Sequence, residues 1–136
     1  MSKILDVVRA HSEMSTLVRG VNAAGLEEEL NGPGPYTVFA PTNLAFGKLP
    51  AGIFEDLLQP ENRGKLFDIL NYHVVRGKTK AKQFSDGQKL KTVNGQTLSI
   101  AVSDGTVSIN GAKIQTRDIE ASNGIIHSLD TVVMPS

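Results

Sequence analysis

Two Asx-Gly pairs, Asp104-Gly105 and Asn110-Gly111, constrain the fold more than any other feature of the chain. Such pairs favour two-residue turns between antiparallel strands, because Asp, Asn and Gly tolerate the positive φ angles that these turns require. A two-residue loop at each pair places residue 103 opposite residue 106 and residue 109 opposite residue 112. We therefore expect a three-stranded antiparallel meander that extends from about residue 98 to about residue 115.

The predicted meander separates apolar from polar side chains, as a sheet with one buried face requires. Its apolar face comprises Leu98, Ile100, Val102, Val107, Ile109, Ala112 and Ile114, and its opposite face carries Ser99, Ser108, Lys113 and Gln115. Leu90, on the preceding strand, joins the apolar face only if the Asn94-Gly95 turn is a three-residue loop over residues 93–95 with a left-handed Gly95. We predict this bulged form.

The first half of the chain has a helical pattern. Its apolar residues recur at helical spacing in three stripes: Ile4, Leu5 and Val8; Met14, Leu17, Val18 and Val21; and Leu66, Phe67 and Leu70. Residues 36–40, 72–75 and 124–134 are expected to be β-structure. Helices first and a meander afterwards indicate an α+β domain, and we expect one domain over residues 1–136 because no repeat or linker divides the chain.

Composition excludes several classes of function. The chain carries 14 basic and 14 acidic residues among 136, whereas a nucleic-acid-binding domain usually has a basic excess. It has no cysteine, so disulfides, thiolate chemistry and cysteine-based zinc sites are excluded. Asp6 and Arg9 interrupt the N-terminal apolar residues, so we expect no signal peptide there. No run reaches the ~20 apolar residues that cross a bilayer.

Catalytic and metal-binding patterns are weak. The three histidines, His11, His73 and His127, have no partner at a metal-ligand spacing such as His-Glu-x-x-His, so we expect neither a metal nor another cofactor. In His127-Ser128-x-Asp130, a histidine on a strand would face away from both possible triad partners. Paired carboxylates that converge only in space stay open as an alternative, but nothing in the sequence favours an enzyme.

Three segments of the chain together resemble the fasciclin domain family. They are Thr37-Val38-Phe39-Ala40-Pro41-Thr42-Asn43-Leu44-Ala45-Phe46, which is similar to the first fasciclin box, Asn71-Tyr72-His73-Val74-Val75, which is similar to the central Tyr-His motif, and Gly124-Ile125-Ile126-His127-Ser128-Leu129-Asp130-Thr131-Val132-Val133-Met134-Pro135, which is similar to the second box. Their order and spacing agree with the family, and the resemblance covers essentially the whole chain.

The resemblance implies a fold in which N-terminal helices pack on a wedge of antiparallel β-sheets. It also implies a non-enzymatic adhesion or extracellular binding module, at the cell surface or in the periplasm, as in single-domain bacterial relatives. Its partners would be a cell-surface protein, a matrix component or a polysaccharide. A carrier of a small apolar ligand is the alternative, since some fasciclin-like proteins hold pigments. A shared fold alone does not fix a function, so the site residues need separate analysis.

Four residues are candidates for partner contacts by this resemblance. In animal relatives, the Tyr-His segment and an Asp-Ile pair before the second box are linked to integrin binding, and here Tyr72, His73, Asp118 and Ile119 match them. Glu120 departs from the family's integrin motif, which has Leu or Met there, so an integrin-like receptor is implied by resemblance only. The alternative is structural: Tyr72 and Ile119 in the core, and Asp118 capping a turn.

The other motif residues are interpreted as structural: Thr37, Phe39, Pro41, Thr42, Asn43, Phe46, His127 and Asp130. Phe39 and Phe46 are apolar enough for the core, and Thr42 or Asn43 can cap the helix that follows. His127 shares a strand face with Ile125 and Leu129, so it needs a hydrogen-bond partner if it is buried. We predict that His127 bonds to the Thr42-Asn43 turn and clamps the two boxes together.

Overall fold

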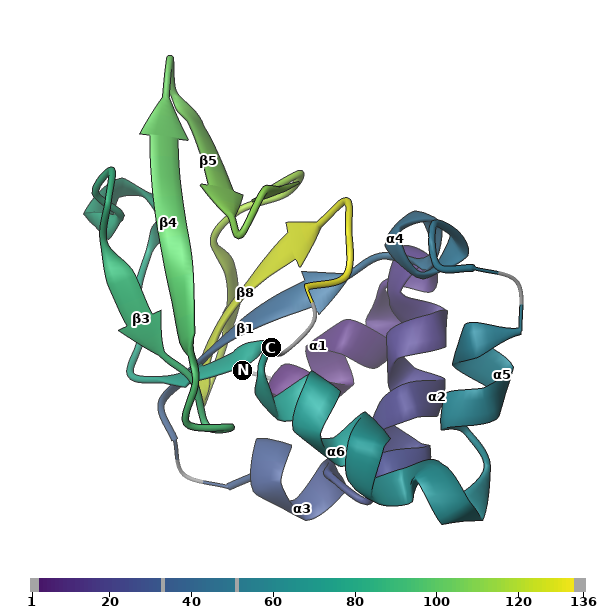
Figure 1. Cartoon of the computed structure of the whole chain (residues 1–136). Helices are drawn as coiled ribbons and strands as arrows, with labels where there is room; N and C mark the ends of the chain where they lie inside the picture. Colours follow the sequence, from purple (N-terminus) through teal and green to yellow (C-terminus); the bar gives the residue numbers. More distant parts are fainter. Residues whose placement is uncertain (1–2, 33, 51, 134–136) are drawn as a thin grey trace.

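The structure is a computed structural model that describes residues 3–32, 34–50 and 52–133 (Figure 1). Met134 and Pro135, the end of the second box, lie outside the described residues. The helices are α1 (Ile4–Ala10), α2 (Ser15–Ala24), α3 (Glu27–Leu30), α4 (Asn43–Gly47), α5 (Ile53–Leu57) and α6 (Arg63–Asn71), with short 3-10 turns at η1 (Ser12–Met14), η2 (Pro60–Asn62) and η3 (Ala81–Gln83).

The strands form two four-stranded sheets. They are β1 (Tyr36–Pro41), β2 (Val74–Arg76), β3 (Lys89–Lys91), β4 (Thr97–Ser103), β5 (Thr106–Ile109), β6 (Ala112–Lys113), β7 (Ile119–Ala121) and β8 (Gly124–Leu129). The first sheet has the strand order β2-β1-β8-β7, and the second has the order β3-β4-β5-β6. Helices in the first half and mostly antiparallel strands in the second confirm the α+β class.

The helices and the first sheet enclose one hydrophobic core. Figure 1 shows α1, α2 and α6 together on one side of the molecule, next to β1 and β8. The core between them includes Ile4, Leu5, Met14, Leu17, Val21, Leu66, Leu70, Val38 and Ile126. The predicted stripes of the first two helices therefore face this core. Burial of these apolar faces, rather than intrinsic helix propensity, stabilises such short helices.

A second core lies between the two sheets. It includes Phe39 and Leu129 from the first sheet and Leu98, Ile100, Val107 and Ile109 from the second, together with Tyr72 and Phe84. Isolated bridges join the sheets at two places, between Val75 and Thr92 and between Ile114 and Leu129. The sheets are thus linked along both sides of this core and diverge toward the β4–β5 hairpin at the top of Figure 1.

The meander has the predicted register. Ser103 pairs with Thr106 and Ile109 pairs with Ala112. Asp104 and Asn110 have φ angles of 51° and 50°, as two-residue turns with left-handed Asx residues require. The predicted apolar face is buried except at Val102, which is half-buried, and Ser99, Lys113 and Gln115 are exposed on the other side.

The loop at Asn94-Gly95 also has the predicted bulged form. Leu90 pairs with Leu98 and Lys91 pairs with Thr97, and Gly95 has a φ of 100°. The backbone N–H of Thr92 donates to the carbonyl of Gln96 across the loop at 2.9 Å. The side-chain alternation therefore selected the correct loop length.

Two expectations for the first half were wrong in detail. The strand predicted from residue 72 begins at Val74, because α6 extends to Asn71 and Tyr72 caps its C-terminus in a helical conformation. Phe67 is 38% exposed, because α6 turns Leu66, Ile69 and Leu70 inward instead. The predicted antiparallel sheets are present, and one pairing adds to the prediction, since β1 and β8 pair in parallel at the centre of the first sheet.

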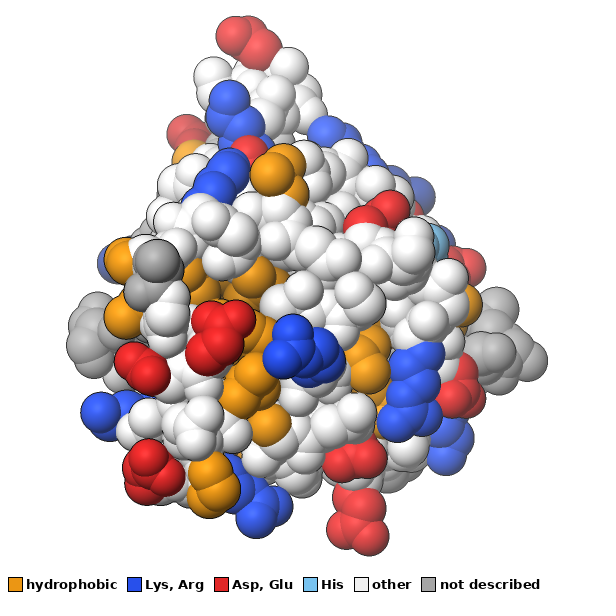
Figure 2. All heavy atoms as spheres, turned by 90° about the vertical axis from the view of Figure 1, so that its right-hand side faces the viewer, with side chains coloured by type: hydrophobic (Ala, Val, Ile, Leu, Met, Phe, Trp, Pro, Cys, Tyr) orange, Lys and Arg blue, Asp and Glu red, His pale blue; other side chains and the backbone are white. Residues whose placement is uncertain are grey.

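The face on the right of Figure 1 carries hydrophobic side chains between acidic and basic ones (Figure 2). Among the described residues, the large hydrophobic side chains with substantial exposure are Leu44 of α4, Ile53 of α5 and Phe67 of α6. These residues are scattered over three helices, which is ordinary for a protein surface.

Candidate functional site

The candidate site is a corner of the surface formed by Asp118 and the start of β7. Asp118 is exposed and has a φ of 57°, a left-handed conformation that Asp and Asn tolerate better than most residues. Its backbone N–H donates to Nδ1 of His127 at 3.1 Å. Asp118 is thus exposed to solvent, while its own backbone N–H is hydrogen-bonded to a buried side chain.

His127 lies fully buried beneath this corner. Its Nε2 lies 2.8 Å from the carbonyl oxygen of Thr79. The ring packs against two aromatic residues, with centroid distances of 5.8 Å to Phe39 and 5.4 Å to Phe84. The imidazole therefore joins two loops that are far apart in sequence, the loop after β2 and the loop before β7.

The predicted bond from His127 to the Thr42-Asn43 turn is wrong. The parallel register places Phe39 beside His127 and Pro41 beside Leu129. Thr42, the residue after β1, consequently contacts Leu129: both its N–H, at 3.1 Å, and its hydroxyl, at 3.2 Å, donate to the Leu129 carbonyl. The two boxes are adjacent, but strand pairing and Thr42 join them.

The bonds of His127 fix its protonation state. Nδ1 accepts from a backbone N–H, so the proton is on Nε2, which donates to Thr79. Burial lowers the pKa of His127 below its ordinary value, because the charged form would lose its hydration. A second proton, on Nδ1, would also displace the Asp118 N–H. The neutral ring is therefore part of the structure.

The segment of residues 77–80, which follows β2, crosses the first sheet above His127. The Thr37 hydroxyl of β1 donates to the Gly77 carbonyl at 2.6 Å and accepts from the Thr79 N–H at 2.9 Å. Thr79 bonds to His127 of β8. The ammonium groups of its two neighbours, Lys78 and Lys80, lie 3.3 and 3.6 Å from the Glu120 carboxylate of β7. This crossing segment thus contacts three strands in turn.

Glu120 gives the corner a mixed charge. Its pKa is lowered, first by the hydrogen bond from Lys78 and then by the positive charges of Lys78 and Lys80. Next to it, the Arg117 guanidinium donates to the Gly105 carbonyl at 3.0 Å. The exposed groups around Asp118 therefore include both acidic and basic side chains, which suits a polar partner surface better than an apolar one.

Asp118 and Ile119, predicted as a pair, face different environments. Ile119 is half-buried, pairs with Ile126 of β8 and packs against the helical core. Only Asp118 of the two presents its side chain to solvent. Contact of either residue with a partner stays a prediction.

Tyr72 and His73 lie in the interior, with 3% and 2% of their surface exposed. The Tyr72 hydroxyl donates to the Thr97 carbonyl at 2.9 Å and accepts from the Asn110 amide at 2.7 Å, which ties α6 to the meander. Partner contact by these two side chains also stays a prediction, and it would require them to leave the core.

His73 is held in the other neutral tautomer. Its Nδ1–H donates to the Ile69 carbonyl at 2.8 Å, and its Nε2 accepts from the Val133 N–H at 3.2 Å. Burial lowers the pKa of His73 to about 4. Both ring nitrogens are thus occupied by backbone groups, as in His127.

The first box also joins elements of the helical half. Thr42 caps α4 by accepting the Ala45 N–H at 3.3 Å. Asn43 does not cap this helix: its Oδ1 accepts the Thr16 N–H at 2.8 Å, and its Nδ2 donates to the Ser12 carbonyl at 3.1 Å. Phe46, 7% exposed, packs its ring 5.0 Å from that of Phe54.

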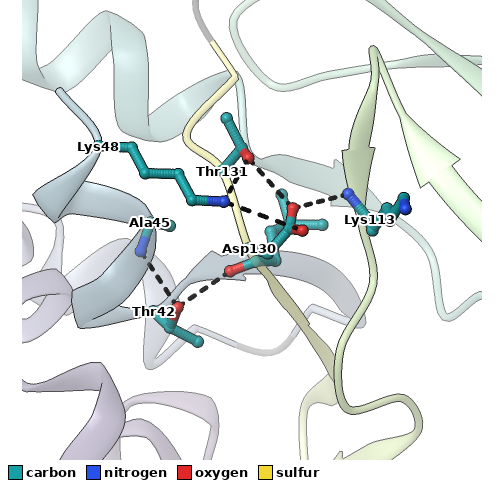
Figure 3. A network of polar contacts seen from close by, with 7 residues as sticks. Thr42, Ala45, Lys48, Lys113, Asp130 and Thr131 are labelled. Carbon is teal, nitrogen blue, oxygen red and sulfur yellow. Dashed lines mark hydrogen bonds and ion pairs between the residues drawn. The ribbon is translucent and has the colours of Figure 1, made fainter.

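Asp130 joins the end of β8 to α4 and β6 (Figure 3). Its Oδ1 accepts the Lys113 N–H at 2.9 Å and the Thr131 hydroxyl at 3.1 Å. The Lys48 ammonium lies 4.0 Å from its Oδ2 and donates to the Thr131 hydroxyl at 3.4 Å. The carboxylate is thus used in structural bonds that link the end of β8 to both halves of the protein.

The arrangement offers no catalytic triad at the second box. The Ser128 hydroxyl oxygen accepts the Thr116 N–H at 2.8 Å, while both nitrogens of His127 are bonded to Thr79 and Asp118. Within the part of the chain that the structure describes, no three His, Cys, Asp or Glu side chains are placed to hold a metal ion. No described helix combines the length and the hydrophobicity of a membrane span.

Sequence reasoning named Asp118 as a candidate for partner contact and His127 as a structural residue, but it did not predict the hydrogen bond between them. It missed Thr79 and the contacts of Lys78 and Lys80 with Glu120. The sequence contains no local signal for these contacts, because they depend on how the crossing segment lies over the sheet.

Comparisons with known proteins agree with this architecture. The chain matches the fasciclin domain over residues 12–135. It is 48% identical to Protein sll1483 of Synechocystis sp. over 132 residues, which cover 97% of this chain and 73% of that protein. It is 37% identical to the transforming growth factor-beta-induced protein ig-h3 of Sus scrofa, over 99% of this chain and 20% of that protein.

Among solved structures, a FAS1 domain pair from the insect cell adhesion molecule fasciclin I has the same fold. The superposition covers 98% of this chain and 51% of that one, with a TM-score of 0.87 and 18% sequence identity. The match over nearly the whole chain, in sequence and in fold, shows that the chain belongs to the fasciclin domain family.

Proposed function

We propose that the chain is a non-enzymatic, adhesion-like binding module that acts as a single domain over residues 1–136. Its partners would be a cell-surface protein, a matrix component or a polysaccharide, met outside the cell, at the cell surface or in the periplasm. Membership of the fasciclin family supports this proposal, as does the fold shared with a domain pair of an insect cell adhesion molecule.

The observation that carries the proposal is the Asp118 corner. Its carboxylate is exposed, while the backbone beneath it is bonded to a buried histidine. A binding group on a fixed backbone loses less conformational entropy when a partner docks than one on a flexible loop, so more of the contact energy appears as affinity. Asp118 is therefore the side chain on which we expect a partner to depend most.

The histidine sites favour binding over catalysis. A general acid or base needs a nitrogen that can reach a substrate. His73 and His127 are buried, and each has one ring nitrogen facing a backbone carbonyl and the other accepting a backbone N–H. Neither ring can exchange a proton with a substrate without breaking structural bonds.

The alternative, a carrier of a small apolar ligand, requires an apolar cavity of adequate size. An enclosed apolar cavity does lie in the helical core, between α1, α2 and the first sheet, but it holds only about 20 Å³. That is room for about one water molecule. Carriage of an apolar ligand stays a prediction that would require this core to expand.

Replacement of Asp118 by Asn tests the proposal. Asn removes the charge but keeps the tolerance for a left-handed backbone. Asp104→Asn is a matched control, because Asp104 is also exposed and also has a positive φ. It lies in the β4–β5 turn, where the Gly105 carbonyl accepts from Arg117, so it removes a nearby carboxylate without changing the residue that is bonded to His127. The measurement is retention of the purified chain by the envelope fraction of the cell that produces it, with integrin-bearing animal cells as a second surface.

We expect wild type and Asp104→Asn to be retained equally on the native envelope, and Asp118→Asn to be retained at least about tenfold less. Equal retention of all three proteins would remove Asp118 from the binding surface. An absence of saturable retention of the wild-type chain would contradict the adhesion-like function itself.

A further inference from the structure

A pocket of about 300 Å³ opens between α2, α4 and α5, on the side of the molecule that Figure 2 presents. Its apolar lining comprises half-buried Leu49 and the small exposed parts of Phe46 and Phe54, which are each 7% exposed and whose rings lie 5.0 Å apart. Arg19 of α2 and Glu55 of α5 also line it. The volume is at the lower end of the range of small-molecule sites in proteins.

Arg19 and Glu55 carry opposite charges in the same pocket but do not pair. Neither side chain has an ion-pair partner within 4.0 Å among the described residues, and both residues are exposed. The Arg19 guanidinium carbon lies 5.7 Å from the centroid of the Phe54 ring. This cation–π contact places the positive charge of Arg19 over the Phe54 ring, and the N–H groups of the guanidinium can still donate to an anion.

Gly47 leaves the rim of the pocket open. It lines the pocket, and a Cβ built on it would meet no atom within 4 Å. A larger side chain can therefore be introduced at this lining residue without displacing a neighbour, and we expect it to narrow the pocket.

We propose that this pocket binds a small zwitterion with an apolar body, of the class of the aromatic and large aliphatic amino acids. The apolar body would pack on Leu49 and on the exposed parts of Phe46 and Phe54, the carboxylate would pair with Arg19, and the ammonium group would pair with a Glu55 oxygen. A simple carboxylic acid would place a like charge near Glu55, and a simple amine would do so near Arg19. Only a ligand with both charges satisfies both side chains.

This inference goes beyond the proposed adhesion-like function and does not depend on it. The pocket lies among helices, whereas Asp118 lies on the loop between β6 and β7. The polar rim also distinguishes its ligand from the purely apolar one considered above.

Three probes of similar size test the charge requirement: L-phenylalanine, 3-phenylpropionate, which lacks the ammonium group, and phenethylamine, which lacks the carboxylate. Each is titrated into the isotope-labelled full chain at pH 7 while backbone amide shifts are followed. We expect saturable shifts around α2, α4 and α5, with L-phenylalanine bound about tenfold more tightly than either single-charge probe, since a hydrogen bond to a charged group contributes on that order. Equal binding of either single-charge probe would overturn the proposal, and so would an absence of saturation by L-phenylalanine.

Variants locate the site and separate the two charges. Gly47→Leu is expected to abolish the shifts, whereas Gly64→Leu, at an equally open glycine of α6 outside the pocket, is expected to leave them unchanged. Arg19→Gln should reduce L-phenylalanine binding to the level of phenethylamine, and Glu55→Gln should reduce it to the level of 3-phenylpropionate. The amide spectrum of each free variant reports folding. A folded Gly47→Leu protein that still binds L-phenylalanine as wild type does would overturn the assignment of the pocket.

Discussion

The surroundings of His73 and His127 differ, although both rings are buried, neutral and bonded to backbone at each nitrogen. His73 joins the C-terminal end of α6 to Val133, near the end of the chain, and both of its partners are buried. His127 joins Thr79 and Asp118, which belong to a half-buried segment and an exposed one. His73 therefore links two buried parts of the core, whereas His127 links two surface loops to the first sheet.

The difference indicates what the loss of each ring would leave behind. Without His73, the Val133 N–H would stay buried with no acceptor, which costs the full desolvation of that group. Without His127, water can reach the Asp118 N–H and the Thr79 carbonyl and replace part of what is lost. The same residue type can thus support global stability in one place and local surface geometry in another.

The largest effect is expected for His73→Ala. The variant leaves a cavity and loses the two hydrogen bonds between the ring and the backbone, so the buried Val133 N–H has no acceptor. We expect it to lose about 4 kcal/mol of unfolding free energy. Urea unfolding followed by circular dichroism measures this loss. A loss smaller than that of His127→Ala would reverse the comparison between the two sites.

Acid pH should destabilise the protein through His73. In the unfolded chain the ring takes up a proton near the ordinary histidine pKa of 6.5, whereas in the folded chain it resists protonation until the pH approaches about 4. Stability from the neutral ring is therefore fully present above pH 6.5 and falls as the pH drops from 6.5 to 4, by roughly 3 kcal/mol in total.

Urea unfolding at several pH values checks this prediction against His73→Gln, which cannot titrate. The wild-type chain should lose more stability than this variant between about pH 7 and about pH 4.5, because the His73 ring takes up a proton on unfolding and the variant lacks it, whereas His127 is present in both proteins. Parallel pH dependences in the two proteins would show that His73 does not govern the acid response.

His127→Ala should have a smaller global effect, of about 2 kcal/mol, which combines the lost ring packing and two replaceable hydrogen bonds. Its local effect should be clearer: amide exchange at Asp118 should become faster, because the Asp118 N–H loses its acceptor. Urea unfolding and hydrogen exchange measure the two effects. An unchanged unfolding midpoint would mean that the imidazole contributes little to holding these loops.

The same contrast explains what the sequence could predict. In the meander, Asp104, Asn110 and Gly95 act through their own backbone angles, and side-chain alternation links each turn to its neighbours. Local chemistry therefore determined register and loop length correctly. In α6, the stripe of apolar residues allowed either Phe67 or Ile69 to face inward, and packing against α2, which no local pattern encodes, selected Ile69.

Such local reasoning could not identify the hydrogen-bond partners of His127. Its bond to Thr79 spans 48 residues of sequence, and it exists because β1 and β8 pair in parallel and the crossing segment lies over them. A sequence pattern indicates that a buried histidine needs a partner, but the choice between the Thr42 turn and Thr79 depends on the relative position of strands. The fold could be predicted, and Asp118 could be named as a candidate for partner contact, whereas the connection between the core and that surface could not be predicted.

The smallest effect is expected for Glu120→Gln, although Glu120 bonds to the same crossing segment as His127. The pKa of Glu120 is lowered by Lys78 and Lys80, yet the carboxylate is exposed, and water and salt screen such pairs strongly. Glu28→Gln is a matched control, since Glu28 is an exposed helix residue without an ion pair among the described residues. We expect both variants to unfold at the wild-type urea concentration, at low and at high salt. If Glu120→Gln instead shifted the midpoint as far as His127→Ala, surface charge rather than the buried ring would hold the crossing segment on the sheet, and the contrast between the two histidine sites would disappear.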